Sequence, residues 1–267
     1  MRIVRSHLCL FGALSCAALN DVRATSGAEA LPPSAEIVPK VIARAQWSKA
    51  QDFQQFYSFT KFTIAEELDD RGRVRNKQEK SGRVPAKAQF PAIAARTGGT
   101  NASSSEPAVP KKPLAQVRVG RAKQAAGKRT IEIDEDTLTR FNFTPLRKEL
   151  LNGRPTLVFA FEPKRNLPVK QLQDRVVNRT AGTVWVDEQE YELVKADIRL
   201  KEPVSFVGGL IGAVQTLHYV IERTRVDEGV WLLAKTELLV KARQLFSPVH
   251  TRKQQQWSDF RRNTGEG

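Results

Sequence analysis

Cysteine is almost absent from this chain. The only two, Cys9 and Cys16, lie within the first thirty residues. The chain that follows them has neither a disulfide nor a thiolate metal ligand, so burial of apolar surface must hold the fold together. At 267 residues the chain is long enough to bury a sizeable core, in one large β domain or two small ones.

Histidine is also scarce, and the patterns of common catalytic sites are missing. His7, His218 and His250 have no acid or second histidine at metal-ligand spacing, so we expect no metal and no cofactor. There is no Gly-x-Ser-x-Gly elbow of a serine hydrolase. Gly120 and Gly127 are separated by six residues, where a phosphate-binding loop has four. We therefore expect that the protein is not an enzyme.

A run of small and apolar residues without charge, residues 8–19, lies near the N-terminus, behind Arg2 and Arg5. This arrangement is typical of a secretory signal over residues 1–30, and the run is too short to span a membrane as a mature helix. Cleavage fits after Ala24 or Ala30. The alternative is lipidation at Cys16, whose preceding residues form a permissive lipoprotein signal. We expect an exported protein.

Positive charge is concentrated in one part of the chain. The formal net charge is +14, and residues 71–129 contain fifteen lysines and arginines against two acids, Glu79 and Glu106. Such a segment favours an anionic partner, such as nucleic acid, lipid headgroups or acidic polysaccharide. The alternative is a solvated basic loop with no specific partner. Phe90 is the only aromatic residue there, which argues against nucleic acid because single strands are bound by stacking.

The composition divides the chain into segments. Residues 31–80 contain a short helical pattern at 40–49, after a loose proline-containing stretch, and then the first strands. Residues 81–113 are rich in Gly, Ser, Pro and Lys and are predicted to be a disordered basic insertion, because they have too little apolar surface to offset the entropy of ordering. Residues 114–262 form the remainder of the domain, and 263–267 are a tail.

Strict alternation of apolar and polar residues dominates residues 182–262. Val194, Ile198 and Leu200 alternate with Lys195 and Arg199, and residues 231–243 repeat the pattern. Alternation of this kind predicts an antiparallel sheet that is covered on one face only. With the earlier strands it gives about eight antiparallel strands and two or three short helices, an α+β half-open barrel.

One loop, residues 206–214, is apolar and contains three glycines. It either folds back to cap the end of the barrel or forms a mobile apolar lip at the mouth of a ligand cavity.

Several short motifs, taken in order, carry a family resemblance. They are residues 56–59 (FYSF), 66–72 (EELDDRG), 140–143 (RFNF), 152–155 (NGRP), 161–164 (FEPK), 181–187 (AGTVWVD), 231–233 (WLL) and 257–261 (WSDFR). The series resembles a bacterial branch of the LolA/LolB-like superfamily of periplasmic lipoprotein carriers and outer-membrane lipoprotein-sorting proteins, over residues 41–262 without the insertion. The resemblance implies an incomplete antiparallel β-barrel with short helices lidding its concave face, a cavity for acyl chains, and a periplasmic location, or an outer-membrane lipoprotein if Cys16 is lipidated.

Nine residues are predicted to line this cavity or its lip: Val194, Ile198, Leu200, Phe206, Leu210, Ile211, Leu232, Leu238 and Val240. The expected partners are lipid acyl chains or a lipidated protein, with an anionic membrane surface on the basic segment and no nucleic acid. The alternative for the lining residues is ordinary core beneath a helix. The alternative function is an envelope interaction or regulatory protein that binds a protein or an anionic polymer through residues 71–129.

Overall fold

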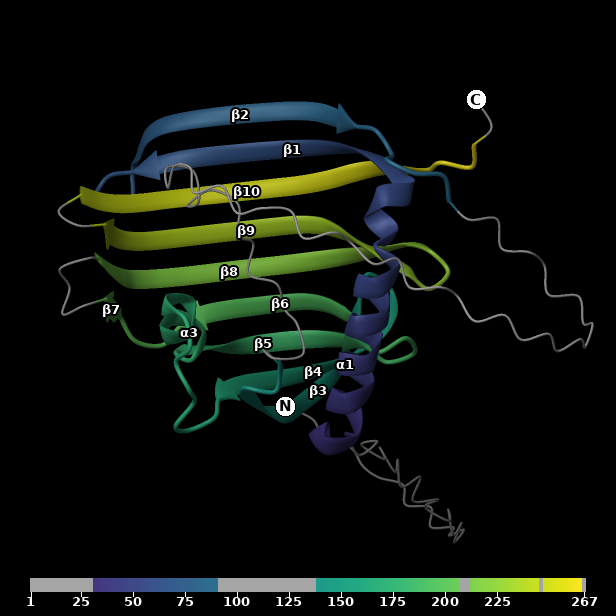
Figure 1. Cartoon of the computed structure of the whole chain (residues 1–267), viewed down its shortest axis with the longest axis horizontal. Helices are drawn as coiled ribbons and strands as arrows, with labels where there is room; N and C mark the ends of the chain where they lie inside the picture. The colour runs from purple at the N-terminus through teal and green to yellow at the C-terminus, as the bar shows by residue number, and fades with distance from the viewer. Residues whose placement is uncertain (1–30, 91–137, 207–211, 245–246, 266–267) are drawn as a thin grey trace, which may run out of the picture. The chain divides into compact units, whose positions relative to one another are not determined.

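The computed structural model describes residues 31–90, 138–206, 212–244 and 247–265 (Figure 1). The predicted signal, residues 91–113 of the predicted insertion, and Leu210 and Ile211 of the predicted lip lie outside these residues.

Within these ranges, ten antiparallel strands form one sheet. They are β1 (Tyr57–Leu68), β2 (Val74–Val84), β3 (Phe141–Leu151), β4 (Arg154–Pro163), β5 (Thr180–Asp187), β6 (Leu193–Leu200), β7 (Val204–Phe206), β8 (Gly212–Asp227), β9 (Val230–Gln244) and β10 (Ser247–Arg262). Their order is β2-β1-β10-β9-β8-β6-β5-β4-β3, with the short β7 paired to β8. Because β2 and β3 end the sheet without pairing to each other, it is an open half-barrel, and the predicted α+β fold is confirmed.

The helices of the described residues lie on one face of this sheet. They are α1 (Ser34–Gln51), the 3-10 turn η1 (Phe53–Phe56) and α3 (Leu172–Val177). Figure 1 shows α1 crossing one end of the strands and α3 lying over the opposite end of β5 and β6. We call the face that they cover the helix face.

The helix α1 starts earlier than predicted. It begins at Ser34, so the stretch before residue 40 is not loose, and it contains Pro39. Ile37 and Val41, four residues apart, are 3% and 6% exposed and pack against the sheet. Burial of this apolar stripe, Ile37 and Val41, compensates for the hydrogen bond that is lost at an internal proline. The local sequence pattern does not reveal this compensation.

Strand ends also differ from the predictions. The segment 191–206, predicted as one strand, is divided into β6 and β7, and the strand predicted from residue 53 begins only at Tyr57, after η1. The boundary predicted at residue 81 lies inside β2. Phe90, within the predicted insertion, packs edge-on against Phe56 at 5.5 Å between ring centroids. The turn predicted at Asn152 and Gly153 is confirmed, since both have positive φ, 53° and 78°.

The core follows from the alternation. Every second residue of β3, β4, β5, β6 and β8 points to the helix face, most of these residues are apolar, and α1 packs against them. The buried members of this main cluster are Ile37, Val41, Leu138, Phe141, Leu157, Phe159, Phe161, Val184, Val186, Ala196, Ile198, Leu217 and Tyr219. A second, smaller cluster is formed by Tyr57, Val230 and Leu232.

The turn between β5 and β6 is held by a fully buried carboxylate, Asp187. It accepts hydrogen bonds from the Arg154 side chain at 2.6 and 3.0 Å, and from the backbone N–H groups of Gln189 and Glu190 at 3.1 and 2.8 Å. Burial by itself raises the pKa of Asp187, but the Arg154 guanidinium and the two N–H groups lower it by more, and the net pKa lies below the ordinary value.

We expect Asp187→Asn to lower the free energy of unfolding by about 3 kcal/mol at neutral pH, because it leaves Arg154 without its partner. A carboxylate whose pKa is depressed in the folded state stabilises the fold above its unfolded pKa of about 4 and ceases to do so as the pH falls through its folded pKa. The difference between wild type and variant in urea unfolding should therefore shrink below about pH 4. An equal difference at neutral and acidic pH would show that the charge of Asp187 does not hold the turn.

Candidate functional site

The helix face contains a continuous apolar surface with two small hollows. One lies beneath α1 and has a volume of about 20 Å³; the other lies beneath α3 and measures about 40 Å³. Leu138, Phe143 and Val184 line both, so the hollows are parts of one surface. Thr180 is the only polar residue in either lining. The lining residues from the two helices are Ile37, Val38, Val41, Val176 and Val177.

Four of the nine predicted lining residues lie together on this surface. Ile198 lines the hollow beneath α3, and Leu200, Leu238 and Val240 pack against the main cluster. As ligand contacts they remain predictions.

The other five predicted residues lie elsewhere or outside the described residues. Leu232 belongs to the second cluster, and Phe206 is half-buried at the end of β7. Leu210 and Ile211 are outside the described residues.

Val194 is displaced from the helix-face row by a bulge. The register shifts there, so that Trp185 pairs with Lys195 while Val186 pairs with Leu193. Leu193 therefore packs against the main cluster, and Val194 instead lines a polar hollow with Arg154. An extra residue of this kind reverses the alternation locally, and period-two reasoning does not detect it.

Sequence reasoning missed the aromatic part of the site. Phe141 and Phe161 meet edge-on, with ring centroids 5.0 Å apart, and Phe143 lies 6.3 Å from Phe161. The signal was present, because phenylalanines two residues apart, at 141 and 143 and at 159 and 161, must lie on one face of a strand.

The helix face changes from apolar to cationic across the sheet. Directly paired residues share a face, and one row runs from Ile198 through Tyr219 and Leu238 to Lys253 and Ala65. The apolar residues of β6, β8 and β9 thus lead to a lysine on β10.

A second lysine lies on the same face. Lys61 is four residues from Ala65 on β1, and its ammonium group lies 4.9 Å from the ring centroid of Trp257. Burial, and secondarily the charge of Lys253, lowers the pKa of Lys61. Within the described residues, neither lysine has a carboxylate partner. Two cations without counter-charges therefore lie beside the apolar surface.

The C-terminal half of α1 is anchored through Glu192, which is 1% exposed. Its carboxylate accepts hydrogen bonds from Arg44 Nε at 2.8 Å, from Ser48 Oγ at 3.0 Å and from Arg223 Nη1. Arg44 also donates to the carbonyl oxygen of Gly229 at 2.6 Å. These contacts join the helix to the β5–β6 turn, to β8 and to the β8–β9 turn.

The first half of α1 is held differently. It contacts the sheet through Ile37 and Val41, and Lys40 lies over the Tyr191 ring at 4.8 Å. Pro39 stands inside this half. The helix is thus fixed by charge at one end and by a small apolar stripe at the other.

Metal-ligand groups and membrane-spanning helices were also sought in the described ranges. No group of three or more His, Cys, Asp or Glu side chains in them is placed to hold a metal ion. No described helix has both the length and the apolar character needed to cross a membrane.

A scan against protein-family models gives no match, and a search of curated proteins gives none. Among solved structures, the chain is similar to a domain named for outer-membrane lipoprotein sorting from Vibrio parahaemolyticus, with 12% identity over 86% of this chain and 95% of that one, at a TM-score of 0.31. It is also similar to a LolA superfamily protein from Nitrosomonas europaea, with 12% identity over 84% and 92% of the two chains and a TM-score of 0.31. A DUF1329 family protein from Desulfovibrio piger matches at 12% identity over 86% and 95%, again with a TM-score of 0.31. Likenesses this distant carry no information about a ligand.

Proposed function

We propose that this chain is a non-enzymatic periplasmic protein that binds an acyl chain of a lipid or a lipidated protein on the helix face, between α1 and α3. The supporting observation is the single apolar surface that the two hollows share. We extend the proposal to carriage of acylated cargo towards the outer membrane, because the sequence predicts an export signal.

The hollows are too small for a long acyl chain as they stand. Volumes of about 20 and 40 Å³ hold at most a few water-sized groups. A ligand must therefore displace part of the cover, and we propose that it displaces the apolar stripe of α1. Burial of its two buried side chains, Ile37 and Val41, stabilises its position by about 3–6 kcal/mol.

An acyl chain can replace that stripe. Each buried methylene contributes about 0.8 kcal/mol, so ten contribute about 8 kcal/mol, more than the stripe that they displace. Binding should therefore require a chain longer than about four to eight carbons. The Glu192 contacts hold the C-terminal half of α1 in place, so displacement is confined to the half before Arg44, where Pro39 already interrupts the hydrogen bonding.

The two unpaired lysines add a preference for charge. An acyl chain that lies across β6, β8 and β9 brings its head group to Lys253 and Lys61. An anionic head group would give these cations the counter-charge that the described residues lack. The ligand class we propose is therefore an amphiphile with a long acyl chain and an anionic head group.

Cross-linking α1 to the sheet should abolish binding. The chain from residue 31 has no cysteine, so Val38→Cys/Leu193→Cys introduces one thiol on α1 and one on β6, both lining the hollow beneath the helix. After reaction with a bismaleimide, affinity for a fluorescent fatty acid should fall at least about tenfold, because the helix can no longer move aside. Fluorescence titration before and after cross-linking measures the change.

The matched control is Val220→Cys/Glu237→Cys, which joins directly paired residues on the opposite face of the sheet. Its cross-linked form should bind as the unmodified chain does. Unchanged binding after the α1 cross-link, or no binding by the unmodified chain, would contradict the proposal.

The head-group preference has its own test. Lys61→Gln/Lys253→Gln should weaken hexadecanoate binding about tenfold, equivalent to about 1.4 kcal/mol, and leave hexadecanol binding unchanged, because only the first ligand is charged. Displacement of a neutral probe measures both ligands. Arg75→Gln/Arg165→Gln removes the same charge from exposed positions and should change neither. Equal effects on the acid and the alcohol would remove the head-group preference and leave acyl binding standing.

A second candidate function is favoured by the described part of the basic segment. Every residue of β2 except Val84 is exposed, and Arg75, Lys80 and Arg83 make no ion pair among the described residues. We propose as the alternative an envelope interaction protein that binds an anionic polymer through residues 71–129.

Deleting residues 91–113 separates the two functions and leaves β2 and Phe90 in place. An acyl-chain binder should keep its fatty-acid affinity. A binder of anionic polymer should lose affinity for heparin, measured as a lower salt concentration for elution from a heparin column. Loss of fatty-acid binding with unchanged heparin elution would contradict both expectations.

A further inference from the structure

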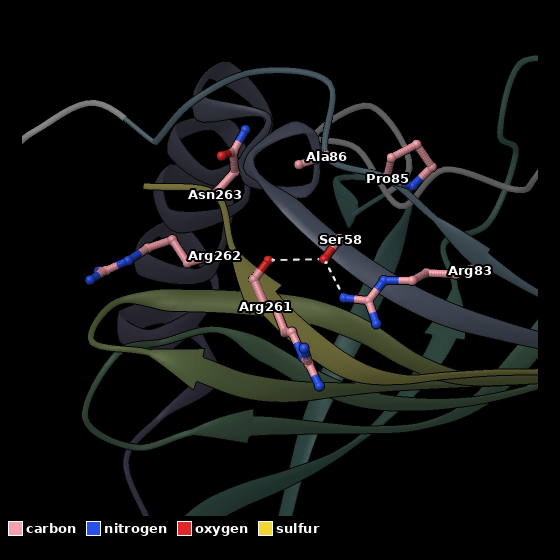
Figure 2. A pocket seen from close by; sticks show the side chains of 7 residues that line it. All are labelled: Ser58, Arg83, Pro85, Ala86, Arg261, Arg262 and Asn263. Atoms are coloured by element: carbon pink, nitrogen blue, oxygen red, sulfur yellow. Dashed lines mark hydrogen bonds between the residues drawn. The ribbon is translucent and has the colours of Figure 1, made fainter. Parts of the chain in front are cut away.

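A cationic hollow of about 570 Å³ lies where β1, β2 and β10 meet (Figure 2). Its polar lining consists of Ser58, Arg83, Arg261, Arg262 and Asn263. No acidic residue lines it. The hollow is separate from the apolar surface of the helix face, with which it shares no lining residue.

Two arginines flank β1 at this point. Ser58 pairs with Arg261 of β10, and Thr60 pairs with Arg83 of β2. The Arg83 guanidinium donates to Ser58 Oγ at 3.0 Å, and Ser58 Oγ donates to the carbonyl oxygen of Arg261 at 3.5 Å. Figure 2 shows Arg83 reaching towards Ser58 in this way. The serine thus fixes the direction of Arg83 across the strand.

The charges of Arg83 and Arg261 are not compensated. Among the described residues, neither makes an ion pair, and a guanidinium carries five N–H donors, of which Arg83 uses one on Ser58. Arg262 differs, because it pairs with Asp227 at 3.5 Å and lies over the Phe90 ring at 5.1 Å. Two guanidinium groups with free donors therefore remain at the hollow.

We propose that this hollow binds a phosphate oxyanion, the chemistry that a phospholipid head group and free phosphate share. A guanidinium fork matches two oxygens of a phosphate, and a tetrahedral anion presents oxygens to two arginines at once. A planar carboxylate presents two oxygens, enough for one fork. Phosphate is therefore favoured over a carboxylate such as acetate.

The test uses the exported, purified chain and two probes. Inorganic phosphate is titrated by calorimetry, with acetate as the comparison, and sedimentation measures binding to phosphatidylglycerol vesicles, with phosphatidylcholine vesicles as the comparison. Arg83→Gln/Arg261→Gln should weaken binding of phosphate, of phosphatidylglycerol, or of both at least tenfold. Arg165→Gln/Arg175→Gln removes the same charge at exposed positions outside residues 71–129 and away from the hollow, and it should change binding less than twofold.

A second variant distinguishes loss of the binding site from loss of the fold. Ser58→Ala keeps both charges and removes only the hydroxyl that orients Arg83. A loss of affinity smaller than that of Arg83→Gln/Arg261→Gln, with an unchanged melting temperature, supports the site. Loss with phosphate alone identifies free phosphate as the ligand, and loss with vesicles alone identifies the lipid head group. The proposal is overturned if wild type binds phosphate no better than acetate and phosphatidylglycerol no better than phosphatidylcholine. It is also overturned if the control variant loses as much affinity as Arg83→Gln/Arg261→Gln.

Discussion

A buried carboxylate decides where α1 lies. Glu192 is almost fully removed from water, and such a charge is tolerated only because Arg44, Arg223 and Ser48 all donate to it. Arg44 comes from the helix and Arg223 from β8, so the pairing fixes the helix against one end of the sheet. Loss of any one donor would leave part of a buried charge uncompensated, which makes this contact hard to break without unfolding the turn.

The rest of the helix face follows from that anchor. With its C-terminal half fixed, the first half of α1 covers the apolar residues of β4, β5 and β6 with two buried side chains, Ile37 and Val41, and with the partly buried Val38 and Ile42. The covering is therefore weaker than the anchor. One hollow lies beneath this half of α1, and the other lies beneath α3. The same face then becomes cationic at Lys253 and Lys61, so one surface presents apolar and charged regions in series. This order of surfaces matches an amphiphile better than a wholly apolar ligand.

Local pattern predicted those features that depend on neighbouring residues. Period-two alternation identified most strands, and Asn152-Gly153 identified a hairpin turn, because both follow from backbone geometry within a few residues. The bulge at Val194 was not predictable, since it depends on the pairing of β6 with β5. The Glu192 contacts and the cationic hollow were missed for the same reason: Arg44 and Glu192, like Arg83 and Arg261, are far apart in the sequence and are brought together only by the order of strands in the sheet.

Native mass spectrometry of the exported chain, combined with lipid extraction, tests acyl-chain binding most directly. We expect a co-purifying lipid or lipopeptide at close to one per chain, with an acyl chain longer than about eight carbons and an anionic head group. A chain that unfolds cooperatively, carries no lipid and takes up none from added hexadecanoate would contradict it, because the helix face would then be an ordinary filled core.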